Sequence, residues 1–209
     1  GGAGDDKFVL GEEYSTADTI VGGADTDTLT MTSGGTTTYT AASVSGVEKF
    51  ELTGKATATT HDFKNLTGVT EVTIANGSDL THTVQGLNSG VTVNLLETAN
   101  VATIDTADAA EVFIDVEVDK NNGSVSVTDT AAVTITGKVG TGDIQALALD
   151  AVDTTSLSLA TTSTNDLDTG AITNTDKLAT YNLTTADHGG TIDVGDMADA
   201  SSLQTITAT

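Results

Sequence analysis

The chain has 209 residues, and its 30 acidic and seven basic residues give a formal net charge of −23. Nucleic acids and anionic membranes are disfavoured as partners, because both are recognised through clustered Lys and Arg, and the chain has no Arg. The absence of Cys excludes disulfide bridges and thiolate metal sites. A hydrophobic share of 37% and many β-branched Thr and Val residues favour an ordered, strand-rich fold over disorder.

Two glycine turns open the chain with a shared pattern. Residues 1–9 read GGAGDDKFV and residues 22–30 read GGADTDTLT, so each has an acid at its sixth position and an apolar residue at its eighth. A half copy, ADTIV, lies between them at 17–21. Glycine permits the positive φ that turns successive carbonyl groups inward, and Ca²⁺ takes roughly six to eight hard oxygen ligands. The turns therefore indicate calcium binding.

This stretch of about 30 residues resembles the RTX (repeats-in-toxin) calcium-binding nonapeptides, which form a parallel β-roll. The resemblance implies that turns 1–6 and 22–27 stack on one side with a cation between them, and that the half copy around Asp18 lies on the other side. Asp25 stands where the motif has its third Gly, so we expect it to be left-handed. The metal ligands implied are Gly1, Ala3, Gly4, Asp6, Asp18, Gly22, Ala24, Asp25 and Asp27.

From residue 45 onward one pattern recurs, a small-residue corner followed by apolar, polar and apolar residues. The apolar pairs are Phe50/Leu52, Val72/Ile74, Val93/Leu95, Val112/Ile114, Val133/Ile135, Leu157/Leu159 and Tyr181/Leu183. Their steps are 22, 21, 19, 21, 24 and 24 residues, and a looser copy at Gln204/Ile206 follows after 23. Further apolar segments lie between these pairs, at 81–87, 101–106, 124–129 and 144–149.

Alternation with a period of two, with turn residues between short runs, predicts strands. A step of about 20 residues suits one coil of a solenoid, with the paired strands on one wall and the intervening apolar segments on the opposite wall. The predicted fold is an all-β, parallel β-solenoid. Residues 1–32 would form RTX-like calcium-binding coils, and residues 33–209 would continue as Thr/Ala/Asp-rich repeats. The alternative is a pair of immunoglobulin-like sandwiches of about 100 residues each.

The repeats SGVEKFELTG (45–54) and LTGVTEVTI (66–74) resemble those of calcium-dependent S-layer proteins and large type I secreted surface proteins of Gram-negative bacteria. The resemblance implies an extracellular location on the bacterial cell surface, type I secretion and self-association into a lattice. Its implied partners are Ca²⁺ and, through regions outside this chain, cell-surface polysaccharide, with no membrane insertion. We expect a non-enzymatic structural component of an S-layer, and the alternative is a repeat segment of a secreted RTX adhesin or exoprotein.

Catalytic chemistry finds little support in the sequence. The motifs H-E-x-x-H, G-x-S-x-G, the phosphate loop and C-x-x-C are absent, so no enzymatic activity is expected. Thr-x-Thr phrases, as at 134–136, are interpreted as ordinary strand faces rather than as an ice-binding array.

The three histidines offer further candidate sites. His61 and His82 are 21 residues apart, so we expect them to stack on one wall as polar rungs, with a transition-metal pair as the alternative. His188 lies at a Gly–Gly turn flanked by Asp187, Asp193 and Asp196. We interpret that turn as an ordinary solvated one, with a further calcium corner as the alternative.

Overall fold

The computed structural model describes residues 1–12, 14–75, 82–95, 102–117, 124–139, 144–151, 153–161, 167–184, 192–194, 196–197 and 200–209. In these ranges the regular structure is β-strand, and every ladder between strands is parallel. No helix long and apolar enough to cross a membrane occurs among these residues. The predicted all-β, parallel β-solenoid is confirmed, and the sandwiches, which require antiparallel sheets, are excluded.

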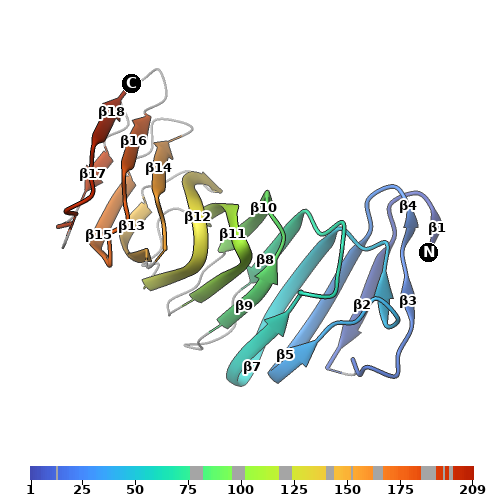
Figure 1. Cartoon of the computed structure of the whole chain (residues 1–209). Coiled ribbons are helices and arrows are strands. Elements are labelled where there is room, and N and C mark those ends of the chain that lie inside the picture. The colour runs from blue at the N-terminus through green and yellow to red at the C-terminus, as the bar shows by residue number, and fades with distance from the viewer. Residues whose placement is uncertain are drawn as a thin grey trace.

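The strands follow one another along a spiral that runs from β1 at the N-terminal end to β18 at the C-terminal end (Figure 1). Their bounds are β1 (Gly2–Ala3), β2 (Lys7–Gly11), β3 (Ile20–Val21), β4 (Gly23–Ala24), β5 (Thr28–Thr38), β6 (Val44–Ser45), β7 (Lys49–Asp62), β8 (Glu71–Ala75), β9 (His82–Leu87), β10 (Val91–Leu95), β11 (Ala102–Glu117), β12 (Ser124–Val139), β13 (Ile144–Ala151), β14 (Ser156–Thr161), β15 (Leu167–Thr173), β16 (Thr180–Thr184), β17 (Ile192–Val194) and β18 (Thr205–Ala208).

Two walls of stacked strands enclose the interior. The first wall contains β2, β8, β10, β14, β16 and β18, together with one half of each long strand β5, β7, β11 and β12. The second wall contains the other halves with β9, β13, β15 and β17, so the long strands pass from one wall to the other. Because β5 also runs across the boundary between residues 32 and 33, the coils of the glycine turns share a strand with the coils that follow.

The register confirms most of the expected steps and corrects two of them. Val93 pairs with Ile114, not with Val112, so this coil has 21 residues rather than the expected 19. Tyr181 pairs with Ile206, not with Gln204, and the last step is 25 residues rather than 23. Both errors are slips of two residues. A slip of two keeps every side chain on its own face, so the alternation of the sequence could not reveal it.

The interior is filled by columns of apolar side chains, one from each coil. On the first wall Leu29, Phe50, Val72 and Val93 are all 0% exposed, and they lie at successive registers of the ladder. The second wall contributes a matching column of Val84, Ile104 and Val127. These columns confirm the inward faces predicted for both sets of apolar segments.

Aromatic side chains are concentrated in the N-terminal coils. The ring of Tyr39 lies 5.2 Å from that of Phe50 and 4.9 Å from that of Phe63, and the rings of Phe50 and Phe63 are 4.9 Å apart and nearly perpendicular. Edge-to-face pairs of this kind add stability beyond the apolar area that they bury. The coils that carry the glycine turns therefore lie against the bulkiest described part of the core.

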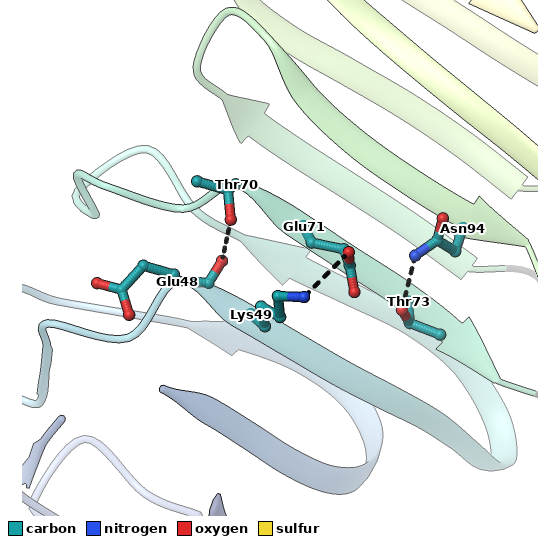
Figure 2. Close-up of polar contacts among 6 residues, drawn as sticks. All are labelled: Glu48, Lys49, Thr70, Glu71, Thr73 and Asn94. Carbon is teal, nitrogen blue, oxygen red and sulfur yellow. Dashed lines mark hydrogen bonds and ion pairs between the residues drawn. The ribbon is translucent and has the colours of Figure 1, made fainter. Parts of the chain in front are cut away.

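Polar side chains on the outside of the first wall connect neighbouring coils (Figure 2). Lys49 Nζ lies 3.5 Å from Glu71 Oε2, and Asn94 Nδ2 donates a hydrogen bond of 3.1 Å to Thr73 Oγ1. Exposed ion pairs each contribute about 0–1 kcal/mol. The buried columns and the backbone ladders therefore supply most of the stability of the solenoid.

Replacing Phe50 with Ala should lower the free energy of unfolding by about 3–5 kcal/mol, because it removes a fully buried ring that contacts both Tyr39 and Phe63. Urea denaturation measures the change. Val9→Ala on the same wall is the control, since Val9 is 67% exposed and should change stability by less than about 0.5 kcal/mol. Equal losses in the two variants would contradict the assigned strand faces.

Candidate metal centre

The two glycine turns lie one above the other, as the sequence predicts. Strand β1 pairs with β4 in parallel, with Gly2 opposite Gly23 and Ala3 opposite Ala24. Asp25 has a φ of 77°, which confirms the left-handed conformation expected where the motif has a glycine. The predicted ligands in turns 1–6 and 22–27 are therefore brought together in pairs.

Acidic side chains bridge these stacked turns. The amide of Asp6 donates to Asp27 Oδ1 at 2.8 Å, and the amide of Gly4 donates to Asp25 Oδ2 at 2.9 Å. In the opposite direction, Asp5 Oδ1 accepts a hydrogen bond of 2.9 Å from the amide of Thr26. Each carboxylate thus uses one oxygen to hold the backbone of the neighbouring coil.

Two carboxylate oxygens, Asp6 Oδ2 and Asp27 Oδ2, lie near backbone carbonyls at the paired glycines. A methyl group at Gly1 would overlap both the carbonyl oxygen of Gly22 and Asp6 Oδ2, which we call the first oxygen pair. A methyl group at Gly22 would overlap the carbonyl oxygen of Gly46 and lie 2.5 Å from Asp27 Oδ2, which we call the second oxygen pair. Gly1 and Gly22 are therefore required because oxygens of the next coil occupy the space of a side chain.

The sequence predicts a corner at residues 45–48 as part of the recurring repeat, but it did not indicate that this third corner stacks on turn 22–27 and adds a carboxylate to it. Glu48 Oε2 accepts a hydrogen bond of 2.9 Å from the amide of Asp27, and the carbonyl of Asp27 accepts one of 3.2 Å from the amide of Glu48. Asp6, Asp27 and Glu48 are 21 residues apart in succession. That constant step was a usable signal, but the corner has Glu in place of Asp and lacks the paired glycines of the nonapeptide.

Asp18 is placed apart from this stack. Its Oδ2 accepts hydrogen bonds of 2.6 Å from the amide of Ser15 and 3.0 Å from Ser15 Oγ, within the turn that precedes β3. Its part in metal binding stays a prediction. Among the residues that the structure describes, no group of three or more His, Cys, Asp or Glu side chains is placed to hold one metal ion. A cation at these turns would therefore depend on carbonyl oxygens as well as on carboxylates.

The two histidines of the second wall are buried but do not stack as expected. His61 pairs with Val84, and His82 pairs with Thr59, so the rings are offset by two residues along the strands. The coil that separates them has 23 residues rather than 21 at this point. His61 Nδ1 lies 2.9 Å from the Tyr39 hydroxyl, and His82 Nδ1 lies 2.8 Å from Thr59 Oγ1.

Burial controls the protonation of both histidines. Desolvation, followed by the charge of the nearby His82, lowers the pKa of His61 to about 4. Desolvation also lowers the pKa of His82 below its ordinary value. Both rings are therefore held neutral inside the solenoid. His188 and Asp187, at the turn interpreted above as an ordinary solvated one, lie outside the described residues, so neither that interpretation nor the alternative of a calcium corner is tested.

No family model, curated protein or solved structure matches the chain.

Replacing Gly22 with Ala should lower the free energy of unfolding by about 3 kcal/mol, because the added methyl group overlaps the Gly46 carbonyl. Gly2→Ala is the matched control, since a methyl group there meets nothing within 4 Å. Thermal unfolding followed by circular dichroism compares the two. If both variants melted together, the close approach of turn 22–27, which is the second corner of the stack, to the third corner would be refuted.

Stability should fall as the pH is lowered from about 6.5 to about 4, because the unfolded chain then binds protons that native His61 does not. The folded pKa is below the unfolded one, so the stabilisation is complete above pH 6.5 and is lost through this window. The shift of His61 corresponds to about 3 kcal/mol at 1.36 kcal/mol per unit. Melting temperatures between pH 4.5 and 7 measure it. His61→Gln should flatten the profile, and an unchanged slope would contradict a buried neutral ring.

Proposed function

We propose that the chain is a non-enzymatic structural segment of a bacterial surface layer whose N-terminal coils are folded by calcium. The observation that carries the proposal is the stacking of the two acidic glycine turns, in which Asp6 Oδ2 and the Gly22 carbonyl form the first oxygen pair. Carboxylate and carbonyl oxygens are the ligands that Ca²⁺ prefers. Gly1, Ala3, Gly4 and Asp6 would face Gly22, Ala24, Asp25 and Asp27 across the cation.

Calcium would act by compensating charge and by joining coils. The chain carries a formal net charge of −23, and self-repulsion of that size opposes compact folding. A divalent cation between two turns cancels part of the repulsion at the place where acids are closest. Because the unfolded chain has no preformed site, binding energy becomes folding energy. Such a protein stays loosely folded where calcium is scarce and folds after export to a calcium-rich medium.

A solenoid suits a structural role because it presents long, regular outer surfaces. The charged and polar contacts of the first wall run from coil to coil, as between Lys7 and Glu51 at 2.7 Å. Repetition of similar surfaces supports lateral self-association into a lattice. The acidic composition and the RTX-like turns support the same cell-surface setting. The S-layer assignment itself rests on resemblance in sequence.

Calcium should raise the melting temperature of the chain, with a gain in the free energy of unfolding of about 2.7 kcal/mol when the free ion is at about 100 times its Kd. Circular dichroism during calcium titration and chelation measures this. Asp6→Asn should reduce the gain, whereas Asp176→Asn, at an exposed position near the other end of the chain, should not. An equal gain in all three proteins would exclude the first oxygen pair as the site.

Electron microscopy tests the structural role. An S-layer component should form ordered two-dimensional sheets when calcium is added and should release them when calcium is chelated. A chain that folds in calcium but stays a soluble monomer would instead indicate a repeat segment of a secreted adhesin. A chain that neither folds nor assembles in response to calcium would refute both.

A further inference from the structure

Asp27 faces the third corner as well as the first turn. Its Oδ1 accepts from the amide of Asp6 on one side, while its Oδ2 shares the second oxygen pair with the Gly46 carbonyl on the other side. The amide of Gly22 is bound to the carbonyl of Ser45 at 2.9 Å, which holds the two corners in contact. The space above Gly22 therefore lies between the second and third corners, one coil beyond the first oxygen pair.

The carboxylate of Asp27 is buried and only half satisfied. Its residue is 0% exposed, and among the described residues its Oδ2 has no hydrogen-bond partner. Burial of an ionised carboxylate is costly unless the group is paired or fully hydrogen-bonded. The Gly46 carbonyl oxygen borders the same space above Gly22, and it is an acceptor that cannot donate a hydrogen bond to the carboxylate.

The nearby cationic and amide groups are engaged elsewhere. Lys7 is paired with Glu51 at 2.7 Å, and Lys49 lies 3.5 Å from Glu71, both on the outside of the first wall. The amide of Asp27 donates to Glu48 Oε2 at 2.9 Å. Glu48 also brings a second carboxylate to the same corner. The corner thus holds two carboxylates and a backbone carbonyl, and none of these groups donates a hydrogen bond to Asp27 Oδ2.

We propose that a second Ca²⁺ binds between the second and third corners, with Asp27 Oδ2 and the Gly46 carbonyl among its ligands. The proposal rests on the proposed function, because it adds one cation to the stack that begins at the first oxygen pair. It extends cation binding into a coil that lacks the glycine nonapeptide. Glu48 is a positioning residue here, since it fixes the backbone of Asp27 and so the direction of its side chain.

A second calcium site predicts that Asp27→Asn changes the stability of the chain in opposite directions with and without calcium. Without calcium, Asp27 Oδ2 is a buried acceptor with no hydrogen-bond partner among the described residues, so Asp27→Asn, which keeps an oxygen for the amide of Asp6, should raise the melting temperature. With calcium, the same variant loses a ligand, so it should gain less stability from the ion than the parent chain does. A purely structural role for Asp27 predicts no such reversal.

Calcium counting by equilibrium dialysis separates the two sites. The full chain, Asp6→Asn, Asp27→Asn and the double variant are compared, with Asp176→Asn as the control. Asp6→Asn should lose the ion of the first oxygen pair and keep the second, and adding Asp27→Asn should then remove one further ion. The expected difference between Asp6→Asn and the double variant is therefore one bound Ca²⁺ per chain.

The number of calcium ions bound by each variant shows which of the two sites exists. If Asp6→Asn loses an ion but the double variant loses no more, the second site is overturned while the proposed function stands. If Asp6→Asn binds as the parent does and only Asp27→Asn loses an ion, the second site is supported and the first is wrong. Equal counts in all the proteins, or a lower melting temperature of Asp27→Asn in chelator, overturn the second site.

Discussion

Every coil of this protein must repeat the position of the coil before it, because parallel strands in register exchange their backbone hydrogen bonds with both neighbours. Each side chain therefore meets its equivalent in the next coil. For apolar residues that requirement is favourable, and it produces the continuous columns inside both walls. For acidic residues it is unfavourable, and it concentrates like charges along one edge of the solenoid.

The N-terminal corners show how that repulsion is managed. Asp6, Asp27 and Glu48 stand at a constant spacing of 21 residues, so their carboxylates fall into a single column. One oxygen of Asp27 and one of Glu48 accept a backbone amide of the preceding coil. Asp6 Oδ2 and Asp27 Oδ2 each lie near a backbone carbonyl of the following coil. The cation binding proposed above would neutralise part of a column of carboxylates that the backbone amides satisfy only on one side.

The same coils carry the aromatic cluster and the buried histidines. Tyr39 contacts Phe50 and Phe63, and its hydroxyl reaches His61 Nδ1. The first coils therefore combine an outer edge that is proposed to bind calcium with a buried histidine whose protonation would lower stability. The later coils lengthen to 24 and 25 residues, since Ile135 pairs with Leu159 and Leu183 pairs with Ala208. The acid column ends earlier, because Thr70 takes the place of the acid in the coil after Glu48.

The sequence by itself determined the fold class, the two inward faces and the pairing of the glycine turns, because alternation, coil length and glycine phase are local properties of the chain. Tertiary structure alone decided the register after Val93, since a slip of two residues leaves the alternation unchanged. It also decided that Gly46 and Glu48 complete a corner, and that Asp27 is buried with one oxygen unpartnered. Those features arise only when separate coils come into contact, and no local pattern encodes which oxygen will lie beside which.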